Sequence, residues 1–364
     1  MACLTYDNCR TITYDKSTNR CEIFVDTPSQ YGSLVTQTDY VTMIAVDDRR
    51  LSPPLLPLHG VTVAGYGNGT SGNANNALRN PWGLAITTNN QLYVSDLGNY
   101  RIMKMKIGNL TGTIAAGTGA PGSTATTFLY PTEIAVNAAS NIYIVDTNSF
   151  RVMLWRNNSS SGIIAAGNGT SGSSIMLISV SIGLAVDSQG NIYVADSNNH
   201  RVMKWAVNAT SAIVIAGVTG VAGSDNQHLN KPYGLYLDES NSYLYIADFK
   251  NHRIQRYRVD IPSNGTTVAG GNGQGSAGNQ LNLPYGVCVS KKTGDIYIAD
   301  KANYRIQRWS VGATSAITIV GTTGVSGTNA TQLNGPANVI LDMNETFLYA
   351  SDIDNHRVQQ YQLP

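Results

Sequence analysis

Hydrophobic and polar residues alternate along most of the chain in short segments that recur at a nearly constant interval. Six such segments align, from "LYVSDLGNYRIMKM" (92–105) to "LYASDIDNHRVQQY" (348–361). Their aspartates stand 50 to 52 residues apart, and an arginine follows each aspartate five residues later. A constant period of this length indicates one supersecondary unit that is used six times. The repeated pairs are Asp96 and Arg101, Asp146 and Arg151, Asp196 and Arg201, Asp248 and Arg253, Asp300 and Arg305, and Asp352 and Arg357.

Each unit predicts four short strands. The first follows a proline, as in "PWGLAI" (81–86), and its nearly continuous apolar character indicates burial on both faces. Segments such as "IYVAD" (192–196) and "RVMKW" (201–205) alternate with a period of two and predict the second and third strands. The fourth has the form "IIAAGNG" (163–169). Six units of four strands predict an all-β fold, a six-bladed β-propeller of four-stranded blades.

The ends of the repeat region predict how the ring closes. The chain reaches Pro364 directly after the third strand of the sixth unit, whereas a fourth-strand sequence, "VTVAGYGNG" (61–69), precedes the first complete unit. We therefore expect this N-terminal strand to complete the last blade, because such pairing removes an open sheet edge and ties the ends of the domain together.

Several of the repeated turns carry a recognisable motif. "NHRV" stands at 199–202 and 355–358, "NHRI" at 251–254, and "NYRI" at 99–102 and 303–306. Together with the recurring P-x-G and Y-hydrophobic-x-D elements, these turns resemble the NHL-repeat family over residues 60–364. The resemblance implies a six-bladed propeller that acts mostly as a binding platform for proteins and, in one intracellular branch, for RNA. Blades two and three depart from the pattern, with Ser149 in place of the asparagine and Ser181 in place of the proline.

The repeated polar residues are interpreted as structural. In the D-x-x-N-x-R turn, Asp196 can accept backbone N–H groups, Asn199 tolerates a left-handed backbone, and Arg201 can pair with the aspartate or with carbonyl groups. A catalytic residue is needed once and not six times, so the same role is expected in all copies. The position before the arginine holds a ring in every copy, which disfavours a zinc site: Tyr100, Phe150, His200, His252, Tyr304 and His356.

Candidate binding residues are expected where the six copies differ. The residue after the proline position should lie near one rim of the central channel, and it is Trp82, Thr132, Ile182, Tyr233, Tyr285 and Ala337 in order. Trp82, Tyr233 and Tyr285 are therefore candidates for a binding patch, with ordinary packing between blades as the alternative. In the next position four blades have glycine, but the second has Glu133 and the sixth has Asn338.

Glu133 and Asn338 are expected to point into the channel. Their oxygens suit calcium, but two ligands fall short of the six or more that calcium takes, and a water-filled polar channel is the alternative. No metal or cofactor is predicted.

Charge and hydropathy restrict the classes of partner. The chain has a formal charge of +1 with 13% charged residues, which disfavours nucleic acid and anionic membrane surfaces. It contains no apolar run long enough to span a bilayer, so no membrane insertion is expected. A monomeric propeller that binds a protein or a glycan is predicted.

The predicted function is non-enzymatic. The alternative is a metal-dependent propeller enzyme resembling amidating lyases or lactonases. Such lyases need histidines on the inner strands, where this chain has none, and a lactonase needs several inward acids, of which only Glu133 stands out.

The N-terminal segment has a different character. Cys3, Cys9 and Cys21 have a spacing that resembles the second half of a PAN/apple module, which implies a small disulfide-bonded extracellular fragment over residues 1–46. Three clustered cysteines leave their pairing open and, with no signal peptide visible, indicate a chain truncated at its N-terminus. Residues 47–59 are predicted to be a proline-rich linker and residues 60–364 the propeller. The isolated Cys288 is interpreted as a small core residue.

Sequons add to the prediction that the protein is extracellular or displayed at the cell surface. The N-x-S/T pattern marks nine candidate glycosylation sites: Asn68, Asn109, Asn157, Asn158, Asn168, Asn208, Asn264, Asn329 and Asn344.

Overall fold

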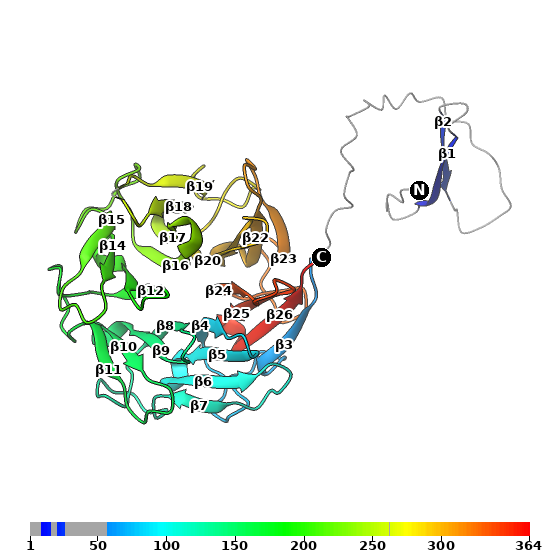
Figure 1. Ribbon diagram of the computed structural model, residues 1–364. Coiled ribbons are helices and arrows are strands. Elements are labelled where there is room, and N and C mark those ends of the chain that lie inside the picture. The colour runs from blue at the N-terminus through cyan, green and yellow to red at the C-terminus, as the bar shows by residue number, and fades with distance from the viewer. Residues whose placement is uncertain (1–8, 16–19, 26–56, 262) are drawn as a thin grey trace. The chain divides into compact units, whose positions relative to one another are not determined.

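A computed structural model describes residues 9–15, 20–25, 57–261 and 263–364 (Figure 1). The chain divides into two units, Met1–Pro53 and Pro54–Pro364. In the first unit, β1 (Cys9–Asp15) and β2 (Arg20–Val25) pair as an antiparallel hairpin. Cys3 and most of the predicted linker lie outside the described residues, and the PAN/apple-like module, its disulfide bonds and the domain limits stay predictions. No helix in the described ranges is both long enough and apolar enough to cross a bilayer.

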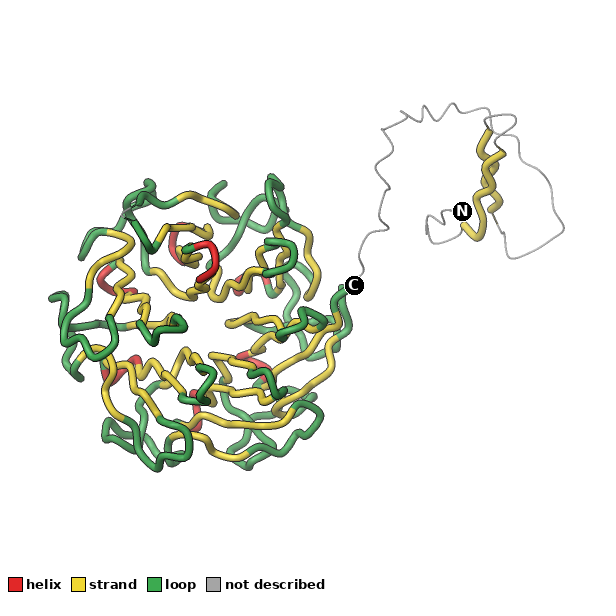
Figure 2. Tube along the Cα trace, viewed as in Figure 1, coloured by secondary structure: helices red, strands yellow, loops and turns green. Residues whose placement is uncertain are grey.

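The second unit consists of six four-stranded antiparallel sheets, which confirms the predicted six-bladed propeller (Figures 1 and 2). Blade one contains β4 (Pro81–Ile86), β5 (Gln91–Asp96), β6 (Arg101–Lys106) and β7 (Thr113–Ala116). Blade two contains β8 (Pro131–Val136), β9 (Ile142–Asp146), β10 (Arg151–Trp155) and β11 (Ile163–Gly167). Blade three contains β12 (Ser181–Val186), β13 (Ile192–Asp196), β14 (Arg201–Trp205) and β15 (Ile213–Gly217).

The other three blades follow the same order from the channel outward. Blade four contains β16 (Pro232–Asp238), β17 (Tyr243–Asp248), β18 (Arg253–Arg258) and β19 (Thr266–Gly270). Blade five contains β20 (Pro284–Val289), β21 (Ile296–Asp300), β22 (Arg305–Trp309) and β23 (Ile317–Gly321). Blade six contains β24 (Pro336–Leu341), β25 (Phe347–Asp352), β26 (Arg357–Gln362) and β3 (Gly60–Gly65).

The N-terminal strand β3 closes the ring as the outer strand of blade six, which confirms the expected closure (Figure 1). Ala64 pairs with Val358 and Val61 with Gln360 in an antiparallel ladder. The first and last strands of the propeller therefore stabilise each other, although nearly 300 residues separate them.

The hydrophobic core lies between neighbouring blades. All five residues of β13 are buried, because the second strand of each blade is covered on both faces. Between blades one and two, for example, Ile102 packs in one cluster with Ile134 and Met153. A single blade exposes much of this surface, so each blade depends on its neighbours for stability.

Short 3-10 helices connect the second and third strands of the blades: η1 (Leu97–Asn99), η2 (Thr147–Ser149), η3 (Ser197–Asn199), η5 (Phe249–Asn251), η6 (Lys301–Asn303) and η7 (Ile353–Asn355). A further one, η4 (Glu239–Asn241), lies in the hairpin of blade four.

The left-handed residue of each turn between second and third strands is the one directly before the arginine, whereas Asn199, whose residue type tolerates that backbone, lies within the 3-10 helix. His200 has φ of 55° and donates its backbone N–H to the carbonyl of Ser197 at 3.2 Å. The reason is that the asparagine belongs to the helical turn, and the chain reverses only at the capping residue.

Candidate functional site: the aromatic end of the propeller channel

The two faces of the propeller disc carry different connections. In blade three, Ser181 pairs with Asp196, Asp196 with Arg201 and Arg201 with Gly217, so these four strand ends share one face. We call it the aromatic face, after the rings described below; it holds the 3-10 turns between second and third strands and the starts of the inner strands. The opposite face, here the hairpin face, holds the connections between first and second strands and between third and fourth strands.

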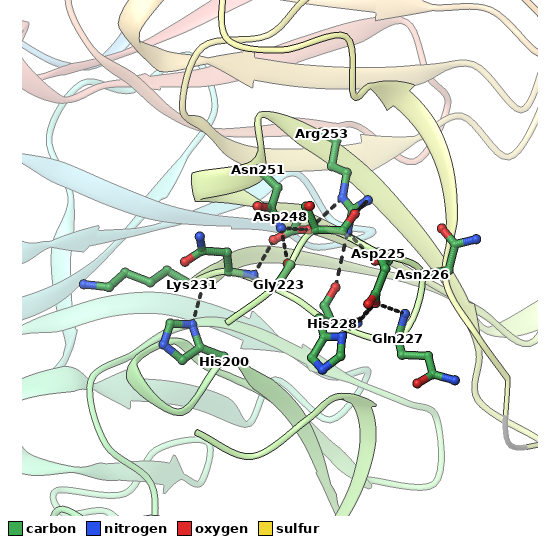
Figure 3. Close-up of polar contacts among 12 residues, drawn as sticks. His200, Gly223, Asp225, Asn226, Gln227, His228, Lys231, Asp248, Asn251 and Arg253 are labelled. Atoms are coloured by element: carbon green, nitrogen blue, oxygen red, sulfur yellow. Dashed lines mark hydrogen bonds and ion pairs between the residues drawn. The ribbon is translucent and has the colours of Figure 1, made fainter. Parts of the chain in front are cut away.

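A buried ion pair organises every turn of the aromatic face. In blade four, Asp248 Oδ2 accepts hydrogen bonds from Arg253 Nε and Asn251 Nδ2, both at 2.8 Å, and Oδ1 accepts the backbone N–H of Asn230 at 2.7 Å (Figure 3). Arg253 also donates to the carbonyls of residues 224, 225 and 228. The pair therefore holds the 3-10 turn against the loop that leads into the inner strand.

The three histidines of these turns link neighbouring blades. His200 Nδ1 accepts the backbone N–H of Lys231 at 3.2 Å (Figure 3), and His252 and His356 accept corresponding bonds from Leu283 and Asn80 at 3.1 Å. Burial lowers the pKa of each of these imidazoles. They act as neutral acceptors at neutral pH, and the described residues contain no cluster of three or more His, Cys, Asp or Glu side chains arranged to hold a metal ion.

The structure brings together the three aromatic residues that the sequence singled out. Trp82 stacks on Tyr285 with ring centroids 5.2 Å apart and an interplanar angle of 23°, and Tyr285 contacts Tyr233 at 5.0 Å. Blade six lies between the blades of Trp82 and Tyr285, and its residue at this position is the small Ala337. The rings of blades one and five can therefore meet across blade six.

Two further residues contact these rings and were not predicted from the sequence. Phe249 stacks on Tyr233 at 4.1 Å with an interplanar angle of 3°. Lys301 Nζ donates to Tyr285 Oη at 3.1 Å and lies 4.4 Å from the centroid of that ring. Both residues directly follow the repeated aspartate, a position that also varies among the copies: Leu97, Thr147, Ser197, Phe249, Lys301 and Ile353. The variation among the six copies at this position is the feature of the sequence that could have marked Phe249 and Lys301 as candidate site residues.

The aromatic cluster is defined here as Trp82, Tyr233, Phe249 and Tyr285. Phe249 is buried, whereas the other three rings are half-buried, so the cluster packs between blades and also presents ring surface to solvent. Burial raises the pKa of Tyr233 and of Tyr285 to about 12, and both phenols keep their protons at neutral pH. A ligand at this surface would meet apolar ring carbons beside hydroxyl groups.

Glu133 and Asn338, on the inner strands of blades two and six, bind each other over blade one. Asn338 Nδ2 lies 2.7 Å from both carboxylate oxygens of Glu133, and both residues are 7% exposed. Gly83 of the intervening blade makes room for the pair, since a Cβ atom there would lie 2.8 Å from Glu133 Oε1. Because Asn338 turns its nitrogen and not its oxygen toward Glu133, the pair offers a calcium ion fewer ligands than the sequence suggested.

Burial of Glu133 raises the pKa of its carboxyl group to about 8, despite hydrogen bonds from the backbone N–H of Ile134 and from Asn338. Between about 4.5 and about 8 the folded state therefore binds more protons than the unfolded state. The contribution of Glu133 to the free energy of unfolding should fall as pH rises through this range, by at most about 1.4 kcal/mol per pH unit, and level off above it.

Replacing Glu133 by glutamine should remove its contribution and so change the slope of stability against pH, because an amide does not ionise. Denaturant titrations at pH 5, 6, 7 and 8 measure the slope. The matched control changes Asp354, an exposed turn residue, to asparagine. This variant is expected to keep the wild-type slope of stability against pH. An unchanged slope in Glu133→Gln would contradict the assignment.

All nine candidate glycosylation sites are exposed. Six lie in connections of the hairpin face: Asn109, Asn157, Asn158, Asn208, Asn264 and Asn344. Asn68, Asn168 and Asn329 lie in loops that lead from an outer strand to the next inner strand. Cys288 is 3% exposed, has a free thiol and packs in the core of blades five and six.

Comparison with known proteins agrees with the repeat pattern. Three segments of the chain match the NHL repeat. They are residues 78–104, 182–205 and 281–309, which fall in blades one, three and five. NHL repeat-containing protein 2 from Bos taurus is 35% identical over 89 residues, which are 22% of this chain and 12% of that protein. The chain thus matches about an eighth of the length of this curated relative.

Solved structures share the fold at low sequence identity. An auxiliary nutrient binding protein from Bacteroides thetaiotaomicron superposes with a TM-score of 0.62 at 15% identity, covering 83% of this chain and 76% of that one. A gluconolactonase from Xanthomonas campestris superposes with a TM-score of 0.58 at 14% identity, covering 87% of this chain and 99% of that one. A streptogramin B lyase superposes with a TM-score of 0.54 at 12% identity, covering 86% of this chain and 100% of that one. Because binding proteins and enzymes both use this propeller, the similarity shows the fold alone.

Proposed function

We propose that this protein is a non-enzymatic interaction protein, secreted or displayed at the cell surface, whose propeller binds a protein or a glycan through its aromatic face. The observation that carries the proposal is the aromatic cluster, with three half-buried rings from three different blades gathered at one end of the channel. Tryptophan and tyrosine are enriched among residues that dominate binding energy, because they bury large areas at a low entropic cost.

The frame under the cluster supports a binding role, because it holds the rings in place before a partner arrives. Tyr233 and Tyr285 follow prolines at the starts of β16 and β20, and the buried Phe249 packs against both rings. The ion pair of Asp248 and Arg253 anchors the turn that carries Phe249. A preorganised surface loses little conformational entropy on binding, which favours affinity.

The exposure of all nine sequons supports placement outside the cell. Glycans on the six hairpin-face sites would stand on the side of the disc opposite the aromatic cluster, and leave that cluster accessible.

Material from a secretory host should carry N-linked glycans. We expect its mobility on a denaturing gel to increase after glycosidase treatment, because the exposed sequons accept glycans in the secretory pathway. A chain in which the six hairpin-face asparagines are changed to glutamine should show a smaller shift. Identical mobility of the wild-type chain before and after treatment would remove this support for an extracellular location.

The enzyme alternative needs a cluster of groups that can hold a metal or act on a substrate. Here the inward carboxyl group, Glu133, is already engaged by Asn338 on both oxygens. Turnover of a lactone by the purified protein, together with a stoichiometric metal ion, would overturn the non-enzymatic proposal.

Replacing Trp82, Tyr233 and Tyr285 together by alanine should weaken partner capture at least tenfold, which corresponds to about 1.4 kcal/mol. The reason is that the variant removes the exposed rings of the site. Affinity capture from the extracellular medium, followed by quantification of each recovered partner, measures the effect.

The matched control changes Leu110, Val311 and Met343 to alanine, since these exposed apolar residues lie in connections of the hairpin face. Circular dichroism of both variants verifies that the propeller remains folded. Equal recovery of all partners by the aromatic variant and by wild type would place the binding surface elsewhere.

A further inference from the structure

The aromatic face carries more positive than negative charges. Four cations lie in its loops and turns: Arg79, Lys231, Lys250 and Lys301. The ion pairs formed within the described ranges include none of these four. Besides the six aspartates that pair with arginines, two acids share the face, Asp225, which is bound to His228, and the exposed Asp354. The net charge of this surface is therefore positive.

The hairpin face has the opposite character. Its connections and the strand ends beside them carry seven acids and five cations: Asp187, Asp238, Glu239, Asp260, Asp295, Asp342, Glu345, Lys106, Arg156, Arg258, Lys291 and Lys292. Two of the acids are used in contacts between blades, since Glu239 accepts hydrogen bonds from Ser188, and Glu345 from Ser290 and Lys291. An anionic ligand is thus favoured on the aromatic face and disfavoured on the other.

Lys301 is placed to bind an anion next to the rings. Its ammonium group has three N–H donors and uses one of them in the hydrogen bond to Tyr285 Oη. Because Tyr285 accepts that bond with its oxygen, its own hydroxyl hydrogen remains available to a ligand. Lys250 Nζ lies 5.1 Å from the ring centroid of Phe249 in the same cluster. Charged donors and apolar ring surface therefore adjoin each other.

This combination fits a sugar that carries a carboxylate. A pyranose ring offers a C–H-rich face that can pack on an aromatic ring, hydroxyl groups that can bond to phenols, and, in acidic sugars, a carboxylate for the ammonium group. A peptide that binds by strand addition needs an exposed strand edge, and a helical peptide needs an apolar groove. The aromatic face offers strand ends and turns instead, since the outer strands run along the circumference of the disc (Figures 1 and 2).

We propose that the aromatic face binds an acidic glycan, whose sugar ring packs against the exposed surface of Trp82 and Tyr285 while its carboxylate pairs with Lys301. This inference rests on the proposed function, which it makes specific by naming the ligand class. Asp354 lies near Lys301, because a Cβ atom on Gly335 would lie 2.7 Å from Asp354 Oδ2 and 3.5 Å from Lys301 Cε. Asp354 therefore weakens the local attraction for an anion.

Titration calorimetry on the full chain tests the proposal. The probes are oligogalacturonate, a hyaluronan hexasaccharide and sialyllactose, each beside its carboxyl-reduced form, with a poly-glutamate peptide as the acidic non-sugar. At least one acidic sugar should bind at least tenfold more tightly than its reduced form, and the affinity should fall with rising salt. Absence of binding by all three acidic sugars overturns the proposal, as does equal affinity for poly-glutamate.

Single variants separate the two parts of the site. Lys301→Met should weaken the acidic sugar at least tenfold and leave the reduced form unchanged, whereas Trp82→Ala should weaken both. Asp354→Asn should strengthen binding of the acidic form a few-fold, and Lys292→Met on the hairpin face should change nothing. An unaffected Lys301→Met variant overturns the ligand class. The proposed function would then still stand if partner capture depends on Trp82, Tyr233 and Tyr285.

Discussion

Replacing Asp196 by alanine is expected to lower the free energy of unfolding by about 3–5 kcal/mol, because it leaves a buried arginine without its partner. Asp196 Oδ2 accepts hydrogen bonds from Arg201 Nε at 2.9 Å and Asn199 Nδ2 at 2.8 Å, and Oδ1 accepts the backbone N–H of Ser179 at 2.8 Å. The side chains of Asp196 and Arg201 are 0% and 1% exposed. Urea titration followed by circular dichroism measures the loss.

The pair of Arg258 and Asp260 provides a matched control. Its side chains are 42% and 40% exposed, so water already solvates both charges. We expect Asp260→Ala to destabilise the fold much less than Asp196→Ala does. Similar losses in the two variants would contradict the conclusion that burial makes the repeated pair important. A partial recovery in the double variant Asp196→Ala with Arg201→Met would support it, because no unpaired charge remains.

Deleting residues 61–65 should destabilise blade six, the blade farthest from them in sequence. The loss of stability should be similar to that of Asp196→Ala or greater. The deletion removes Val63 and Ala64, which are 5% and 0% exposed, and leaves the edge of β26 unpaired. Lost apolar burial and lost ladder hydrogen bonds together amount to about 5 kcal/mol. Native-state hydrogen exchange should show reduced protection over residues 347–362 first, and in blade three last.

The control for the deletion is Val61→Asp, which changes the same strand at a residue that is 63% exposed. This variant should lose only a few tenths of a kcal/mol, since surface substitutions of this kind are nearly neutral. Unchanged protection of β26 in the deleted chain would show that the closing strand contributes little to blade six.

The repeat pattern explains why so much of the fold was predictable. Strand type, blade number and the closing strand all follow from alternation and spacing, and these are local properties repeated six times. Leu229 and Leu281, which occupy the same repeat position three residues before an inner strand, are both 0% exposed. The position of the left-handed residue was not predicted, because the side chain of Asn199 suits either role and only the backbone of the turn decides between them.

The candidate site was predictable only in part. Trp82, Tyr233 and Tyr285 were found because they occupy one repeat position, but the pattern left open whether they meet. Phe249 and Lys301 occupy another position, and nothing in their spacing places them against Tyr285. Their role follows from how three blades converge.

By itself, the sequence determined the architecture: six units of four strands, a turn held by Asp and Arg in each, and a ring closed by residues 60–65. Only the tertiary structure decided which dissimilar residues of different blades touch. Glu133 meets Asn338 across 205 positions of sequence, and Trp82 meets Tyr285 over the small Ala337. The physical reason is that periodicity specifies the residues of one blade relative to its own backbone. Contacts at the channel depend instead on the size of the side chains that all six blades direct toward a common axis.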